Sequence, residues 1–156
     1  MFQKGKKLSL SVGDIFAVPL RGRGYGFGRL LYMEGKWRLA EFFSVFKSSH
    51  AYSDSIVESG RLIPVHNIMT FAIEAGDWPL IGHDPVFVFN DIDDLVFYKG
   101  LKDSRQFFKI NGELLNPDEV RALPSASSMP QSAEYISDLL WDKLVAEGRV
   151  EFNSID

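Results

Sequence analysis

Acidic side chains gather in one segment of the chain, and their chemistry gives the first indication of function. Residues 74–94 contain six carboxylates and no Lys or Arg: Glu74, Asp77, Asp84, Asp91, Asp93 and Asp94. Carboxylates at this density can bind a hard cation or present a negative surface to a basic partner. The glycine and terminal glutamate of an EF-hand are missing around Asp91, so we expect no metal site. No motif indicates another cofactor.

The same segment contains Trp78-Pro79, which offers an aromatic anchor among the acids. A negative surface with such an anchor can dock onto a basic cleft, such as the nucleic-acid groove of a nuclease. In the alternative interpretation, Trp78 belongs to the core and the acids only keep the surface soluble. The six carboxylates are our candidate partner-binding residues.

The three histidines offer little catalytic chemistry. His66 lies in an apolar run, so we expect it in the core, and His50 lies in a Ser-rich loop. His83 follows Gly82 in the acidic segment, where Asp77 or Asp84 is available as an acid–base partner. The sequence has no cysteine and no GxSxG, which removes two familiar nucleophile patterns. We therefore predict a protein without catalytic residues, and the His83 pair remains an alternative.

The glycine-rich stretch at residues 13–29, GDIFAVPLRGRGYGFGR, is the second chemical feature. It interleaves cations with aromatic rings, as single-strand nucleic-acid binders do: Arg21, Arg23, Tyr25, Phe27 and Arg29. It lacks the order of a phosphate loop and leads into a strand. A pI of about 5.4 argues against a nucleic-acid partner. The simpler interpretation is a scaffold hairpin, and an alternative partner patch would contain Arg21, Arg23 and Tyr25.

Charge is distributed unevenly along the chain. Residues 1–47 contain nine Lys and Arg and three acids, a net charge of +6. Residues 48–156 contain eight Lys and Arg and eighteen acids, a net charge of −10. This asymmetry can steer a charged partner, unless folding disperses it over the surface.

The bulk composition is that of one globular domain. The chain has 156 residues, of which 46% are hydrophobic and 24% charged, enough to bury a core without disulfides. The absence of cysteine suits a reducing compartment. No apolar run approaches the ~18 residues of a membrane helix, and the basic N-terminus has no signal-peptide core. We expect a cytoplasmic protein without a membrane span.

Apolar runs and turn residues predict mostly β-strands. We expect strands at residues 14–20, 25–33, 36–46, 61–73 and 85–98, and a hairpin at 105–115. The alternation in the third run fails near Ala40-Glu41, which indicates a bulge. Residues 47–60 are a predicted loop. Residues 117–123 and 132–147 are predicted helices, the second one capped by Ser132 and ended by Gly148.

The predicted fold class is mainly β (α+β). We expect a bent antiparallel sheet or a small SH3-like barrel, with a C-terminal helix packed on it. Residues 1–156 would form a single domain, β-rich over 13–115 and mostly helical over 116–156.

Three short motifs resemble the Imm26 family of immunity proteins from bacterial polymorphic toxin systems: GDIFAVPL, YGFGRLL and WPLIG. The matching positions span the first two thirds of the chain: Gly13-Asp14, Pro19, Gly26-Phe27-Gly28-Arg29, Trp78-Pro79 and Gly82. The resemblance implies a non-enzymatic, mainly β protein that neutralises a cognate protein toxin in the cytoplasm. Glycine, proline and tryptophan at these positions are typical of scaffold, so we expect the contacts elsewhere.

Overall fold

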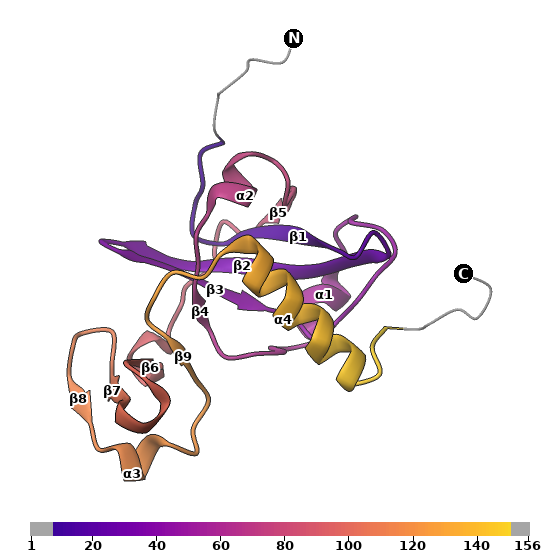
Figure 1. Ribbon diagram of the computed structural model, residues 1–156. Helices are drawn as coiled ribbons and strands as arrows, with labels where there is room; N and C mark the ends of the chain where they lie inside the picture. Colours follow the sequence, from indigo (N-terminus) through magenta and orange to yellow (C-terminus); the bar gives the residue numbers. More distant parts are fainter. Residues whose placement is uncertain (1–7, 151–156) are drawn as a thin grey trace.

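The computed structural model describes residues 8–150; the basic N-terminus (1–7) and residues 151–156 of the predicted domain lie outside it. The described part contains two β-sheets and one long helix, α4 (Ala133–Ala146), which lies against the larger sheet (Figure 1). The larger sheet has the order β4-β3-β2-β1-β5, and all its neighbouring strands are antiparallel. Its strands are β1 (Asp14–Leu20), β2 (Gly24–Glu34), β3 (Trp37–Phe42), β4 (His66–Asn67) and β5 (Leu80–His83).

Strands β1 to β3 form the predicted meander. The turn between β1 and β2 places Arg21 (φ 53°) and Gly22 (φ 65°) in the left-handed region, which glycine favours. The register between β2 and β3 shifts between Leu30 and Tyr32. The bulge predicted near Ala40-Glu41 therefore lies on the partner strand, opposite the expected position.

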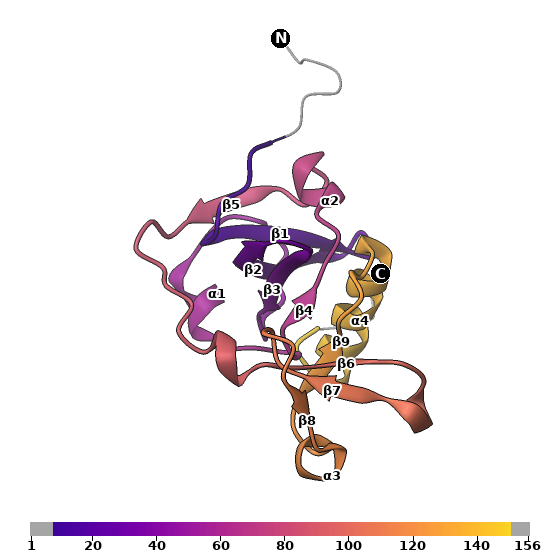
Figure 2. The same cartoon turned by 90° about the vertical axis from the view of Figure 1, so that its left-hand side faces the viewer.

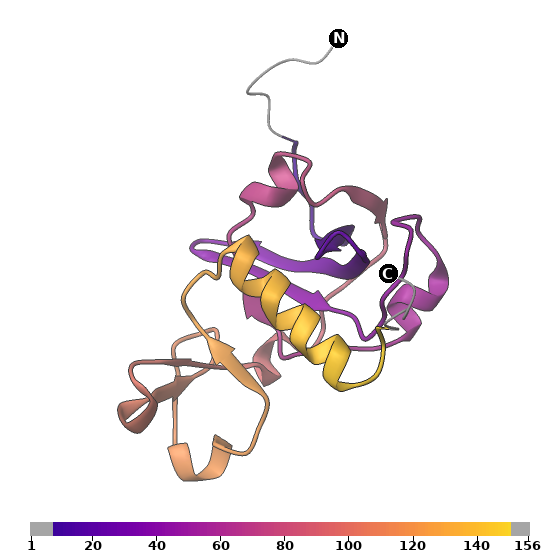
Figure 3. The same cartoon turned by 45° about the vertical axis from the view of Figure 1, so that its right-hand side comes forward.

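One face of the larger sheet packs against α4. The helix lies across this face (Figure 3). Its apolar stripe (Ile136, Leu140 and Leu144) is fully buried there. Phe16 in β1 stacks on Trp78 with ring centroids 5.6 Å apart. Trp78 is only 4% exposed, so it is a core residue and not a surface anchor.

The opposite face packs against α1 (Asp54–Glu58), a helix inside the predicted loop at 47–60. Ile56 of α1 is fully buried against Ala17, Phe27 and Phe43. Figure 2 shows α1 and α4 on opposite sides of strands β1 to β3. The sheet is therefore covered on both faces, which explains the nearly continuous burial of β1.

The smaller sheet has the order β8-β7-β6-β9. Its strands are β6 (Val96–Lys99), β7 (Gln106–Phe108), β8 (Leu114–Leu115) and β9 (Ser125–Ser127), and β9 pairs with β6 in parallel. The hairpin predicted around Asn111-Gly112 is confirmed, since Gly112 has φ 90° between β7 and β8. The short helices are α2 (Phe71–Glu74), α3 (Pro117–Val120), η1 (Ile92–Asp94) and η2 (Lys102–Ser104).

Both predicted helices are present, with side-chain caps. Asn116 accepts a hydrogen bond from the Asp118 N–H ahead of α3, and Ser132 accepts one from the Tyr135 N–H at the start of α4. Gly148 follows α4 with φ 70°, as a helix C-terminus favours.

Two predicted strands are much shorter than expected. Only His66 and Asn67 of the 61–73 run pair in a strand, and α2 begins at Phe71. Only residues from Val96 onward pair in the 85–98 run. In residues 86–89 the structure does show the alternation of exposed valine and half-buried phenylalanine, but this segment crosses from one sheet to the other. Its backbone therefore lacks a neighbouring strand, and alternation alone does not make a ladder.

The fold is mainly β, as predicted, but no closed barrel forms within residues 8–150. β4 and β5 are the two edges of the larger sheet and do not pair with each other, so the SH3-like barrel alternative is wrong. None of the helices in the described range is long and apolar enough to cross a membrane.

Candidate partner-binding surface

The segment at residues 84–95, which we call the acidic strap, connects β5 to β6. Figure 2 shows it descending from β5, past α1, to η1 beside the smaller sheet. It carries four of the six predicted carboxylates: Asp84, Asp91, Asp93 and Asp94. The strap brings these charges to one flank of the molecule, where they become candidates for contact with a basic partner.

Two phenylalanines attach the strap to the protein. Phe87 and Phe89 pack against the apolar cluster between the two sheets. The guanidinium carbon of Arg29 lies 4.1 Å from the centroid of the Phe87 ring, and that of Arg61 lies 5.9 Å from the centroid of Phe89. The alternating Val86 and Val88 are 82% and 68% exposed. The strap therefore presents two apolar side chains to solvent between its carboxylates.

An ion-pair network around the buried Glu41 supports these two arginines. Glu41 in β3 is 5% exposed and accepts from both cations. Arg29 Nε donates to its Oε2 at 2.8 Å, and Arg61 Nε donates to its Oε1 at 2.8 Å. Arg61 Nη1 also reaches Asp91 Oδ2 at 3.4 Å. The positive charges of Arg29 and Arg61 are matched by the negative charges of Glu41 and Asp91. The network therefore holds the end of the strap against β3.

A cleft of about 450 Å³ opens between α1 and the beginning of the strap. Its polar lining comes from three segments of the chain: Arg29, Tyr52, Asp54, Glu58, His83 and Asp84. Partial burial and the hydrogen bond to Asp54 raise the pKa of Tyr52, so its phenol is protonated at neutral pH. Asp54 and Glu58 enlarge the acidic flank, and the sequence interpretation missed them because it assigned 47–60 to a loop. Five residues are too few for a helical period to be visible.

His83 lines this cleft but pairs with a different carboxylate from those proposed. Its Nδ1 lies 2.8 Å from Asp14 Oδ1, whereas Asp84 only shares the cleft and Asp77 does not line it. Asp14 is buried and also accepts from the Ser11 N–H. The described residues that line the cleft include no Ser, Thr or Cys. The structure thus gives His83 a hydrogen bond to Asp14 in place of the expected partners, Asp77 or Asp84.

The other two histidines lie away from this cleft. His66 is buried as expected, with its Nδ1 against the Pro64 carbonyl, and burial lowers its pKa. It is therefore neutral at neutral pH. His50 is exposed and makes an edge contact with Tyr25.

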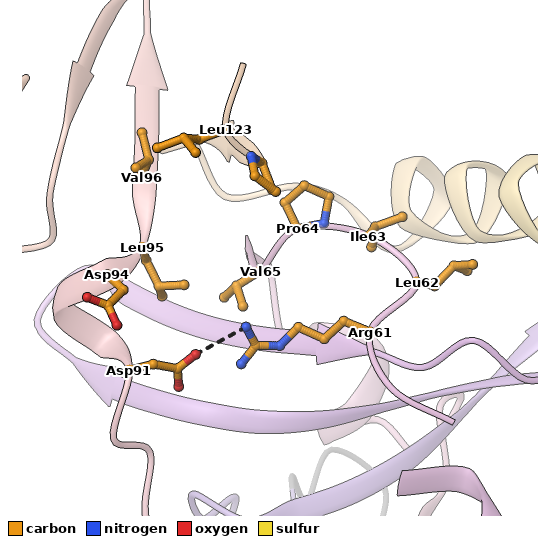
Figure 4. Close-up of a pocket in the computed structure, with 11 residues that line it drawn as sticks. Arg61, Leu62, Ile63, Pro64, Val65, Asp91, Asp94, Leu95, Val96 and Leu123 are labelled. Atoms are coloured by element: carbon orange, nitrogen blue, oxygen red, sulfur yellow. Dashed lines mark hydrogen bonds and ion pairs between the residues drawn. The ribbon is translucent and has the colours of Figure 1, made fainter. Parts of the chain in front are cut away.

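A second recess, of about 420 Å³, lies at the far end of the strap. Figure 4 shows Asp91 and Asp94 on one side of it and Arg61 reaching toward Asp91 from the other. Most of the remaining lining is apolar and comes from residues 62–65, Leu95-Val96 and Leu123-Pro124. The recess combines a hydrocarbon wall with carboxylates.

The structure does not bring all six predicted carboxylates together. Glu74 and Asp77 lie in and after α2, above the larger sheet, whereas η1 leads into β6 below this sheet (Figure 1). Glu74 accepts a hydrogen bond from the Thr70 hydroxyl at 2.7 Å, and Asp77 is exposed. The strap and α2 are therefore two separate acidic surfaces.

The fold also divides the stretch of alternating cations and aromatic rings in residues 21–29. Arg21 pairs with Asp138 of α4 at 2.8 Å, and Arg23 is exposed in the same turn. Tyr25 is half-buried, Phe27 is fully buried, and Arg29 belongs to the Glu41 network. A buried Phe27 cannot stack on a base, so the five residues do not form one nucleic-acid platform.

Comparison with known proteins identifies the class of this chain. Residues 11–109, well over half of the chain, match the family model Immunity protein 26 (Imm26), and the chain belongs to this family. The resemblance inferred from the short motifs is thereby confirmed. No curated protein and no solved structure matches the chain. The matched residues run from β1 to β7 and include the whole acidic strap, whereas β8, β9 and α4 follow them.

Proposed function

We propose that this protein binds a cognate bacterial toxin in the cytoplasm and neutralises it by occluding its active or substrate-binding site. Its membership of the Imm26 family is the observation that carries the proposal. The chain would act as a single domain, because α4 packs against the sheet that the family match covers. An immunity protein needs a specific contact surface rather than catalytic groups, so the surface chemistry indicates the mode of binding.

The acidic strap and α1 together make the best candidate for that surface. Asp93 and Asp94 are exposed on the strap, and Asp54 and Glu58 are exposed on α1. The exposed Val86 and Val88 supply apolar contacts among these carboxylates. Protein interfaces commonly have an apolar centre and a polar rim. The fitting partner is a toxin with a basic cleft, such as the substrate groove of a nuclease. The patch of Arg21, Arg23 and Tyr25 is a weaker candidate, because Arg21 is already paired with Asp138.

Co-expression with the product of the neighbouring toxin gene tests this proposal. A variant with Asp84→Lys and Asp93→Lys should bind the toxin at least about tenfold more weakly and lose protection, since like charges would oppose the partner. The matched control is Glu74→Lys with Asp77→Lys, which changes the net charge equally at the α2 end. It should protect like the wild type.

The outcomes separate the function from the surface. If the wild-type protein neither forms a complex with the toxin nor protects the cell, the proposed function is wrong. If the wild type protects and the strap variant protects equally well, the function stands but the contact surface lies elsewhere. Loss of protection in the α2 variant alone would move the interface to Glu74 and Asp77.

A further inference from the structure

The recess at the end of the acidic strap has the shape and lining of an anchor pocket. Its walls come from three separate parts of the chain: Ile63, Pro64 and Val65 after β3, Leu95 and Val96 at the start of β6, and Leu123 after α3 (Figure 4). A hollow of about 420 Å³ with these walls excludes water from a hydrocarbon chain that enters it. The walls alone would accept any apolar side chain.

The charges at the rim narrow the choice of occupant. Arg61 lines the pocket, but its guanidinium is already engaged by Glu41 and Asp91. Asp94 is exposed, and it forms no ion pair with any residue in the described range. Its backbone N–H donates to the Asp91 carbonyl at 3.1 Å, which fixes its place in η1. One carboxylate charge is therefore left uncompensated beside apolar walls.

We propose that this pocket receives one Lys or Arg side chain from the protein partner. The methylene stem would pack on Val65, Leu95 and Leu123, and the cationic head would pair with Asp94, as amphipathic side chains arrange themselves at apolar surfaces. A carboxylate or phosphate is disfavoured, since Asp94 repels it and Arg61 is already paired. The partner's identity as the toxin rests on the function proposed above, whereas the chemistry of the pocket does not.

A protein side chain is favoured over a free amine because the pocket continues into a wider contact surface. The exposed Val88 and Asp93 lie on the strap on either side of Asp91, and they offer apolar and acidic contacts next to the pocket. A few anchor residues near the centre of an interface, arginine among them, contribute most of the binding energy in many complexes.

A ligand titration tests the pocket without a toxin. Full-length protein with labelled methyl groups is titrated with n-butylguanidinium chloride, and n-butanol serves as the uncharged probe. The guanidinium should shift the methyl resonances of Val65, Leu95 and Leu123. Asp94→Asn should weaken its binding at least about threefold, and Asp103→Asn, an exposed acid on η2, should leave it unchanged. Equal responses to both probes, or no effect of Asp94→Asn, would overturn the proposal.

A double-mutant cycle with the toxin then tests the source of the side chain. Each Lys and Arg of the toxin is replaced by Ala and measured against wild-type and Asp94→Asn protein. One basic residue should show a coupling of about fivefold or more in Kd, and Leu123→Ala should couple with the same residue. If a complex forms but no basic residue of the toxin couples with Asp94, the proposed role of the pocket is wrong and the immunity function stands. Absence of any complex contradicts the immunity function, and the titration alone then decides the chemistry of the pocket.

Discussion

At the scale of single residues, Glu41 is a buried carboxylate held between two arginines. It is buried on β3 and accepts hydrogen bonds from Arg29 and Arg61, whose guanidinium groups in turn lie over Phe87 and Phe89 of the strap. A buried ion pair adds little stability compared with an apolar replacement, but removal of one partner leaves an uncompensated charge. Glu41 therefore holds the position of the strap rather than simply adding stability.

Replacement of this carboxylate should be costly. Glu41→Gln leaves two arginines facing a neutral amide, and we expect the free energy of unfolding to fall by about 3 kcal/mol. Urea denaturation followed by tryptophan fluorescence measures the change. Glu58→Gln, at an exposed position on α1, is the control and should change stability by less than about 0.5 kcal/mol. A Glu41 variant as stable as this control would show that the network is dispensable.

At the scale of elements, α4 shows that the core extends beyond the residues that match the family. The match ends at residue 109, yet Ile136, Leu140 and Leu144 complete the main apolar cluster on the larger sheet. A Cβ at Gly26 of β2 would lie 3.5 Å from Leu140 Cδ1, so the helix approaches the strand closely. The helix is part of the domain core.

Replacement of one buried leucine of α4 by alanine should therefore destabilise the whole domain. Leu140→Ala removes a side chain that is 1% exposed, and we expect a loss of about 3 kcal/mol in the free energy of unfolding. Thermal unfolding measured by near-UV circular dichroism should show one cooperative transition at a lower Tm. Asp142→Ala, on the exposed side of α4, should leave Tm nearly unchanged. A Leu140 variant that unfolds like the Asp142 variant would mean that α4 only rests on the sheet.

At the scale of the whole molecule, folding gives the charge asymmetry of the chain a direction. Arg29 is mostly buried and Arg61 is partly exposed, and both are neutralised by Glu41 and Asp91. Asp93 and Asp94 stay exposed on the same flank, and α1 adds further acids. The flank is consequently more negative than the net charge of −4 would suggest.

The rate of association with the toxin should therefore depend on salt. We expect the association rate constant to fall about tenfold between 0.05 and 0.5 M NaCl, because the Debye length shrinks over this range. Stopped-flow fluorescence at matched temperature measures it. The Asp84→Lys, Asp93→Lys variant should bind more slowly at low salt and show a shallower dependence. A rate that does not change with salt would contradict a partner steered by the acidic flank.

The sequence by itself determined the features that depend on neighbouring residues. Alternation and turn glycines predicted the meander of β1 to β3. Asn111-Gly112 predicted the hairpin of β7 and β8. Ser132 and Gly148 marked the ends of α4. The short motifs gave the family. These signals are local, because a turn, a cap or a strand period is encoded within a few residues.

Only the tertiary structure decided which distant residues meet. The run at 85–98 has strand-like alternation, but its path between two sheets leaves most of it unpaired. The acids of residues 74–94 separated into two surfaces, and Asp54 and Glu58 joined one of them from α1. The link between Arg29, Glu41, Arg61 and Asp91 joins residues up to 62 positions apart. Such contacts depend on how the sheets pack, which no local pattern in the sequence records.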